Sequence, residues 1–287
     1  MSRLGSLAGR LVRRSISSVI GGAVVAAIVV VALFAPLMAP FDPVEIRVRD
    51  RLVPPNAVHR FGTDNLGRDV FSQVLYGARL SLLIGTSVVA IAGTAGIAIG
   101  LLAGFQPRLD QPLMRLVDGM MAFPGILLAI ALMAIMGQRL SNVIIAMCVI
   151  YTPRFARIVR GVVLVIRELD YVQASRACGA SDFRLMRVHV LPNAVAPIIV
   201  QVTFTFAESI LAEAALNFLG AGLPPDVPSW GNVIATGRQL LQTAPWITIF
   251  PGVAIMVTVL GLNLLGDGLR DLTDPRLRAR IAVRPQP

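Results

Sequence analysis

Long uncharged stretches dominate this sequence of 287 residues and constrain its fold more than any other feature. They cover residues 15–41, 80–107, 119–138, 140–153, 188–207 and 239–266. A helix needs about 20 mostly apolar residues to cross a bilayer, and most of these stretches are long enough. The fourth is shorter, so we expect its helix to leave the bilayer near Arg154 and continue amphipathically, and the fifth to run from Pro192 to about Leu216. The sequence therefore predicts an all-α integral membrane protein with six transmembrane helices.

The composition supports this class and excludes several chemistries. Only 15% of the residues are charged, against about 25% in an average soluble domain. All 26 basic residues are arginine, which excludes a P-loop lysine on nucleotide phosphates and Schiff-base catalysis. Cys148, Cys178, His59 and His189 lie far apart in the sequence, so neither a disulfide framework nor a zinc site is indicated. We expect no catalytic residue and no metal site in this chain.

The arginines carry information about orientation. A formal net charge of +10 could indicate nucleic acid binding, but the arginines alternate with uncharged stretches and form no single basic face, so no nucleic acid partner is expected. With both termini cytoplasmic, 18 arginines fall in cytoplasmic segments and 8 in external ones. Cytoplasmic loops carry the excess of positive charge, so both termini are predicted to face the cytoplasm.

These features divide the chain into segments. We expect a cytoplasmic N-terminus (1–14), a first transmembrane helix (15–36), an extracytoplasmic loop (37–78), a transmembrane core (79–268) and a cytoplasmic tail (269–287). The first helix follows Arg13 and Arg14 as a signal peptide would, but it is long and no clear cleavage site follows. We therefore expect it to remain as an anchor.

Two external loops have features beyond those of simple connections. The sequence FGTDNLGRD at 61–69 supplies glycines for turns, with Asp64 and Asn65 able to bond to the backbone there. An amphipathic helix after Asp69 would lead into the second span; an ordinary loop with an interfacial helix is the alternative. In the loop at 217–246, Ser229 could cap a short helix, and Trp230 and Trp246 lie where interfacial aromatic anchors are expected.

The cytoplasmic stretch at 154–192 is basic, with seven arginines against three acids, and its part at 168–192 is too polar for the bilayer. It predicts two short helices separated by a break at Gly179, the second with Ser181 or Asp182 as its N-cap and Pro192 beyond its end. Such a pair is a plausible docking surface for a cytoplasmic partner. A solvated loop that only sets the topology is the alternative.

The same stretch resembles a motif of ABC importer permeases, the EAA motif. It contains QASRACG at 173–179, then nine residues, then HVLP at 189–192. Ala174, Gly179, Leu191 and Pro192 match the motif, while Gln173, Ser175 and His189 replace its Glu, Ala and Ile.

Further segments resemble the C-type permease subunits of dipeptide, oligopeptide, nickel and glutathione importers. They are FGTDNLGRD (61–69), YGARLS (76–81), AFPGI (122–126), NFLG (217–220), PSWG (228–231) and NLLGDGLRD (263–271). This resemblance implies a type I ABC importer permease in the bacterial inner membrane, with an N-terminal helix packed around a five-helix core. It also implies a homologous second permease subunit as a heterodimer partner, two cytoplasmic ABC ATPase subunits and an extracytoplasmic substrate-binding protein. Membrane lipid would be a further partner of this chain.

The resemblance implies a transport subunit that is not an enzyme. ATP and Mg²⁺ would be bound by the partner ATPases, and this chain would bind no cofactor. The residues implied to couple it to the ATPases are Tyr171, Gln173, Ala174, Ser175, Gly179, Ala180, Asp182, Arg184, Arg187, Leu191 and Pro192. Gly179 would let the two short helices turn, and Pro192 would separate the segment from the fifth span. Residues 170–176 and 191–198 favour a peptide substrate over nickel or glutathione.

Glu208 and Glu213 are the carboxylates that fall well inside a predicted span. Each costs about 2.5 kcal/mol or more if exposed to lipid, so both should face protein or a water-filled path. Five positions apart, they lie roughly 140° from each other around a helix and do not share one face. We assign both to the translocation path as a prediction, with interhelical hydrogen bonds as the alternative. A proton-coupled secondary transporter that uses them as a relay is the alternative function, and an assembly protein without transport is a third.

Overall fold

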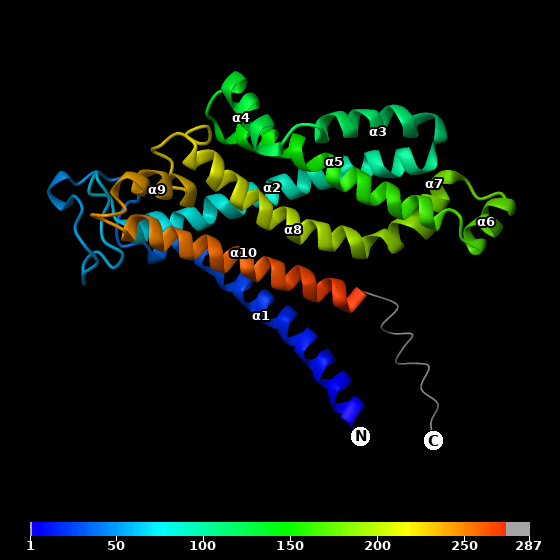
Figure 1. The fold of residues 1–287 in the computed structure, drawn as a ribbon, viewed down its shortest axis with the longest axis horizontal. Helices are drawn as coiled ribbons and strands as arrows, with labels where there is room; N and C mark the ends of the chain where they lie inside the picture. Colours follow the sequence, from blue (N-terminus) through cyan, green and yellow to red (C-terminus); the bar gives the residue numbers. More distant parts are fainter. Residues whose placement is uncertain (1, 274–287) are drawn as a thin grey trace.

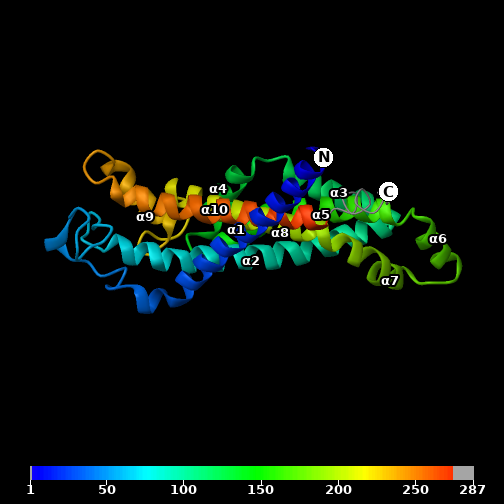
Figure 2. The same cartoon turned by 90° about the horizontal axis from the view of Figure 1, so that it is seen from below.

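The computed structural model describes residues 2–273, with side chains from 16 to 271, and that part of the chain is helical and carries no β-strand longer than an isolated bridge (Figures 1 and 2). The predicted tail beyond residue 273 lies outside the described residues. The longer helices are α1 (Ser2–Met38), α2 (Val70–Phe105), α3 (Pro107–Met121), α4 (Gly125–Met136), α5 (Leu140–Ile166), α8 (Leu191–Phe218) and α10 (Trp246–Thr273). The short ones are η1 (Val48–Asp50), α6 (Asp170–Ala177), α7 (Asp182–Leu185), η2 (Met186–Val190), α9 (Trp230–Gly237) and η3 (Arg238–Leu240).

Four of these helical segments are long and apolar enough to cross a membrane. They are Ile16–Met38, Val70–Phe105, Asp182–Phe218 and Trp246–Asp271, and α3 with α4 would make a fifth if the bent pair is one span. Helix α5 does not join this group, since Arg154, Arg157 and Arg160 interrupt its apolar sequence. The all-helical membrane class is confirmed, whereas the number six stays a prediction.

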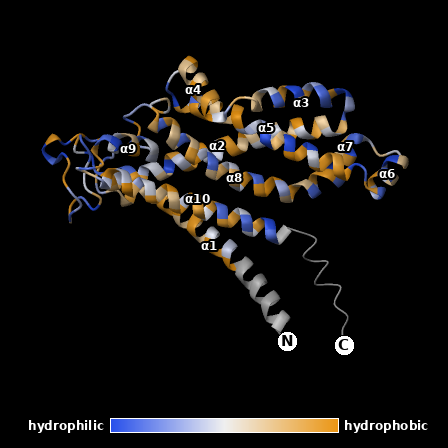
Figure 3. Ribbon diagram, viewed as in Figure 1, coloured by the Kyte–Doolittle hydropathy of each residue, from blue (hydrophilic) through white to orange (hydrophobic). Residues whose placement is uncertain are grey.

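The third predicted span is broken. Helices α3 and α4 meet at an angle of 87° across residues 122–124, so the uncharged stretch at 119–138 forms no straight helix. Pro124 disfavours helical backbone at Phe123, and the first helix accordingly ends at Met121. The 12 residues of α4 span only about 18 Å, well short of a bilayer core of about 30 Å. Figure 3 shows hydrophilic residues along α3 beside the mostly hydrophobic α4.

The second span begins nine residues before the predicted start of the core. Asp69 caps α2 by accepting a hydrogen bond from the Ser72 backbone N–H at 2.8 Å, so the helix starts at Val70. The predicted amphipathic helix and the second span are thus one continuous helix. The predicted loop at 37–78 is correspondingly shorter and runs from residue 39 to Asp69.

The predicted separation at Pro192 is wrong. Helix α7, the π-helical turn η2 and α8 continue one another as a single helical segment, Asp182–Phe218. Proline has no N–H to donate and its ring clashes with the preceding turn of an α-helix. The wider π-turn absorbs this, with the Leu191 N–H donating to the Met186 carbonyl five residues earlier. The segment at 182–192 is therefore joined to α8 without a break in the helix.

Helix α2 lies at the centre of the bundle and packs against α5, α1 and α8. In both ribbon views, α9 and the loop before α2 lie at one end of the molecule and α6 and α7 lie at the other (Figures 1 and 2). We call these the α9 end and the α6 end. Helix α1 packs along α10 and diverges from the bundle toward its own N-terminus (Figure 1).

The loop before α2 folds around two buried aspartates at the α9 end. Asp64 is 1% exposed, and its two oxygens accept four hydrogen bonds, including 2.6 Å from Arg68 Nε and 3.1 Å from Gln73 Nε2. Asp69 also accepts from the Ser72 hydroxyl and lies 2.9 Å from His59 Nδ1. The predicted turn-holding role of Asp64 is confirmed, but the side-chain oxygen of Asn65 is buried without a hydrogen-bond partner.

The interfacial prediction for the tryptophans is wrong for Trp230. Its side chain is 1% exposed, and its Nε1 donates to the Val74 carbonyl of α2 at 2.9 Å. Trp246 is part-buried and donates to the Thr63 carbonyl at 3.1 Å. The Trp230 indole therefore ties α9 to α2, and the Trp246 indole ties the start of α10 to the loop before α2. Ser229 caps α9 as predicted, accepting from the Asn232 N–H at 3.1 Å.

Asp64→Asn is expected to destabilise the fold by about 3 kcal/mol or more, because it leaves the Arg68 guanidinium buried against an amide. The measurement is a thermal melt in detergent with a thiol-reactive fluorescent dye, in a Cys178→Ser background where the buried Cys148 reports unfolding. Asp42→Asn is the control, since the exposed Asp42 side chain accepts from the nearby Val44 N–H and holds no buried cation. Equal melting temperatures for the two variants would contradict the role assigned to Asp64.

Candidate functional site

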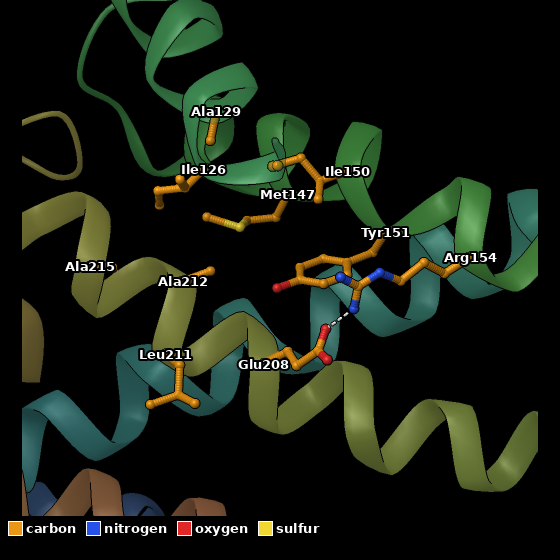
Figure 4. A pocket seen from close by; sticks show the side chains of 11 residues that line it. Ile126, Ala129, Met147, Ile150, Tyr151, Arg154, Glu208, Leu211, Ala212 and Ala215 are labelled. Atoms are coloured by element: carbon orange, nitrogen blue, oxygen red, sulfur yellow. Dashed lines mark hydrogen bonds and ion pairs between the residues drawn. The ribbon is translucent and has the colours of Figure 1, made fainter. Parts of the chain in front are cut away.

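A hollow of about 390 Å³ lies between α4, α5 and α8. Its lining is mostly apolar, with Ile126, Met147, Tyr151 and Leu211 around the charged Arg154 and Glu208 (Figure 4). Small-molecule sites commonly have volumes of about 300–1,000 Å³, mostly apolar walls and a few polar groups. The hollow has the size and the chemistry of such a site.

Arg154 and Glu208 form an ion pair across the hollow. Arg154 reaches from α5 and Glu208 from α8, and Nη1 of the arginine bonds to Oε2 of the glutamate (Figure 4). The Tyr151 ring lies 5.4 Å from the guanidinium carbon. The two side chains remain 42% and 45% exposed, so the pair is open to the space around it. Charged groups within the span of a membrane helix characteristically face a pathway or each other, and these two groups pair with each other.

A second hollow of about 380 Å³ lies on the other side of the ion pair. Its lining includes Gln201, Phe204 and Ile158, together with the same Arg154 and Glu208. Along α8, Gln201 and Phe204 precede Glu208 and lie toward the α6 end, whereas Leu211 in the first hollow follows it toward the α9 end. The ion pair thus lies between two hollows that succeed each other along the bundle.

Glu213 lies elsewhere. It is 1% exposed, and one of its oxygens accepts a hydrogen bond from Asn217 Nδ2, which also donates to the Ser229 hydroxyl at 2.8 Å. Asn217 in turn accepts from the Leu223 N–H at 2.6 Å. This network ties the end of α8 to the loop before α9. The two glutamates do lie on different faces of the helix, and Glu213 lines neither hollow.

Sequence reasoning did not identify Arg154 as a site residue. We had interpreted it as a marker of cytoplasmic orientation, although a carboxylate inside a span needs a counter-ion. The signal was the spacing of three arginines at 154, 157 and 160, each of which pairs with an acid on another helix. Arg157 contacts Asp118 and Arg160 contacts Asp110, both on α3.

The predicted coupling residues gather at the α6 end. Gly179 has a φ of +87°, which a glycine adopts without strain, and it separates α6 from α7. Ser181 caps α7, and Arg176 bonds to Asp182 at 2.9 Å across the turn. The exposed members of the predicted set are Tyr171, Gln173, Ala174, Gly179, Arg184, Arg187, Leu191 and Pro192, whereas Ser175, Ala180 and Asp182 are half-buried.

Apolar contacts fix this segment to the bundle. Val172 of α6 and Leu185 of α7 are buried in one cluster with Phe105 of α2 and Val163 of α5. The Tyr171 ring lies edge-on to His189 with 5.5 Å between centroids, which joins α6 to η2. The segment therefore presents an exposed outer surface and is attached to α2, α5 and α8 through its inner one.

Comparison with known proteins gives concordant results over most of the chain. The family model described as binding-protein-dependent transport system inner membrane component matches residues 96–279, and the model for the N-terminal TM domain of oligopeptide transport permease C matches residues 4–55. The chain is 50% identical to a putative peptide transport system permease protein of Brucella suis biovar 1 (strain 1330), over 94% of this chain and 91% of that protein.

Other relatives differ in what their names say they transport. The dipeptide transport system permease protein of Alkalihalophilus pseudofirmus is 43% identical over 93% of this chain and 88% of its own length. The glutathione transport system permease protein of Pectobacterium atrosepticum is 41% identical over 94% of this chain and 90% of its own length. Among solved structures, an inward-facing methionine ABC transporter shares the fold, with a TM-score of 0.60 and 20% identity over 71% of this chain and 97% of that chain.

Proposed function

The chain belongs to the family of binding-protein-dependent transport system inner membrane components, and on that premise we propose that it forms half of the pathway through which an ABC importer moves peptides. It is a multi-pass inner membrane protein with the fold of type I importer permeases. The observation that carries the proposal is the Arg154–Glu208 pair between two successive hollows. A pathway needs such polar groups inside an otherwise apolar bundle.

Peptides are the substrate class that the relatives support best. Relatives at 50% and 43% identity carry peptide and dipeptide transport in their names, and the glutathione relative is 41% identical. Glutathione is itself a modified tripeptide, so a pathway for short peptides is compatible with all three. Nickel is the remaining alternative within this branch, and the mostly apolar lining of the first hollow offers few ligands for a metal ion.

The partners follow from the family and from the exposed segment at the α6 end. We propose a homologous second permease as a heterodimer partner, two ATPases of which one docks on α6 and α7 of this chain, and a binding protein that delivers peptide at the α9 end. Both termini would then be cytoplasmic, because four arginines, at positions 167, 176, 184 and 187, follow α5 at the α6 end, and cytoplasmic segments carry the excess of positive charge. ATP and Mg²⁺ would be bound on the ATPases.

The coupling mechanism uses the continuity of the helix from α7 to α8. Closure of the ATPases would push α6 and α7, and the helix through Pro192 would carry that movement to Glu208 on α8. A conformational change can be driven only by partners that bind two states with different affinity. Peptide-loaded binding protein on one side and ATP-bound ATPases on the other supply that difference.

Gly179→Arg is expected to remove ATPase coupling. The turn at Gly179 lies in open space, so an arginine there adds backbone strain and bulk at the docking surface without a clash inside the bundle. Tagged wild type purified in mild detergent should bring along a second permease and ATPases with peptide-stimulated activity. The variant should either fail to bring the ATPases along or show peptide stimulation of ATPase activity that is lower by about tenfold.

Gly137→Arg is a matched control for this experiment. Gly137 has a φ of +83° and equally open surroundings, but it lies between α4 and α5 and away from α6. It should retain the ATPases. A wild-type chain that purifies alone, without ATPase activity, would refute the importer assignment and support a proton-driven carrier instead. Uptake that continues when ATP is depleted and the proton gradient is maintained would also support a proton-driven carrier.

A further inference from the structure

The Arg154–Glu208 pair separates the two hollows and is exposed to both of them. Residues of α5 and α8 on one side of the pair line the first hollow, and residues of the same two helices on the other side line the second. A solute that moves along these two helices from one hollow to the other therefore passes both the guanidinium and the carboxylate. Passage between the two groups requires the pair to open.

Opening the pair leaves one positive and one negative charge without partners at membrane depth. A solute with one charge of each sign can pair with both groups at once. The Arg154–Glu208 pair is then replaced by two ion pairs, one between each side chain and the solute. A singly charged ion would satisfy only one group and leave the other uncompensated, which is costly away from bulk water. The site thus favours a zwitterion over an ion of either sign.

We propose that Arg154 and Glu208 bind the two charged termini of a short peptide, with the peptide carboxylate on Arg154 and the peptide ammonium on Glu208. This inference rests on the proposed function and names the substrate feature that the pathway recognises. The planar guanidinium binds a carboxylate in a bidentate manner, and Glu208 accepts from an ammonium group. Once the peptide leaves, the side chains meet again and close the passage.

The size and lining of the first hollow fit this ligand. An extended dipeptide spans about 7 Å between its ends, which is within the reach of two long side chains on facing helices. Ile126, Met147 and Leu211 present apolar surface and no charge to the peptide side chains. Methionine adapts to varied shapes, so the walls tolerate different side chains while the charged pair fixes the backbone ends.

The test measures uptake of three dipeptides that share free termini and differ in side-chain charge: neutral, acidic and basic. The whole importer is reconstituted in proteoliposomes with saturating wild-type binding protein. Each rate is divided by the wild-type rate for the same peptide, which cancels the selectivity of the binding protein. Glu208→Gln and Arg154→Gln should each lower uptake of the neutral dipeptide about tenfold, because one hydrogen bond to a charged group contributes about that factor to binding affinity.

The two variants should also shift selectivity in opposite directions. Glu208→Gln leaves a net positive site, so the ratio of acidic to basic dipeptide uptake should rise at least about threefold. Arg154→Gln leaves a net negative site and should lower that ratio by a similar factor. Glu208→Asp and Arg154→Lys keep the charges and should leave the ratio near that of the wild type.

Arg160→Gln is the matched control. Arg160 lies on the same helix and is paired with Asp110 at 2.7 Å, but it lines neither hollow. It should leave the acidic-to-basic ratio unchanged even if it weakens the fold, and recovery of the ATPases with each variant reports assembly. Equal losses for all three dipeptides in both charge-removing variants would overturn the inference while leaving the importer intact. Failure of the wild-type complex to take up any peptide would instead overturn the proposed function.

Discussion

Gly100→Val is expected to abolish the folded protein. A Cβ at this position in α2 would lie 2.6 Å from the Ala156 carbonyl oxygen and 2.7 Å from the Val159 Cβ of α5. Both neighbours are close to the α5 backbone, so a rotamer change cannot relieve the contact. Valine adds two further methyl groups to this clash and requires the helices to separate.

The effect is large because Gly100 belongs to a row of close contacts. Gly96, Gly100 and Gly104 recur every four residues on one face of α2, where a Cβ would meet Phe155, Val159 and Val163 of α5. In a membrane, helices associate largely by such close packing, with small residues at the interface. Separating the pair at Gly100 also disrupts the contacts one turn away on either side. The cost is therefore expected to exceed the roughly 1–3 kcal/mol typical of an overpacked core.

The readout is the amount of monodisperse permease extracted from membranes, measured by size-exclusion chromatography with fluorescence detection. Gly161→Val is the matched control, since Gly161 lies within α5 and nothing lies within 4 Å of its added Cβ. We expect near wild-type yield for Gly161→Val and almost none for Gly100→Val. Similar yields for both would mean that α2 and α5 are farther apart than the structure places them.

The uncharged stretches predicted most of the fold, because a helix that lies in lipid must consist mostly of apolar residues. The first, second, fifth and sixth stretches each overlap most of a helix long enough to span. The errors lie where one residue controls the backbone: Pro124 breaks the third stretch, and Asp69 starts α2 earlier than its apolar run. At Pro192 a break was predicted from local rules, but a π-turn accommodates the ring.

The candidate site was less accessible to sequence reasoning. The motif spacing located the segment at the α6 end, since its residues are neighbours in the chain. The Arg154–Glu208 pair joins residues 54 positions apart on helices that no local pattern brings together. Burial of Trp230 likewise depends on contact with α2, more than 150 residues away. Such long-range contacts decide which charged or aromatic residues lie inside the protein.

Trp230→Ala is expected to destabilise the fold by about 3–5 kcal/mol, the range for truncating a large buried aromatic residue. The indole is buried in one cluster with Ala78 of α2, Ile210 of α8 and Ile255 of α10. Gly77 makes room for it, since a Cβ there would lie 2.6 Å from Trp230 Cδ1. One side chain from α9 thus fills the space where three long helices meet.

Trp230→Phe separates the hydrogen bond from the packing. Phenylalanine retains most of the apolar surface but cannot donate to the Val74 carbonyl, so about 1 kcal/mol of stability should be lost. Phe123→Ala is the control for removing an aromatic ring, because Phe123 is 64% exposed in the turn between α3 and α4. The expected order of melting temperature places Phe123→Ala nearest the wild type, then Trp230→Phe, then Trp230→Ala.

The thiol-dye melt in the Cys178→Ser background measures all three variants, because buried Cys148 lies on α5 in a core cluster that includes neither Trp230 nor Phe123. If the indole only anchored the protein at the membrane interface, its removal would cost little stability in detergent, and Trp230→Ala would melt close to the wild type. If the indole is buried and joins α9 to α2, its removal should lower the stability in any solvent. The difference in melting temperature between Trp230→Ala and Trp230→Phe therefore decides between the two roles. A large difference assigns Trp230 to the core, and a negligible difference would support an interfacial role.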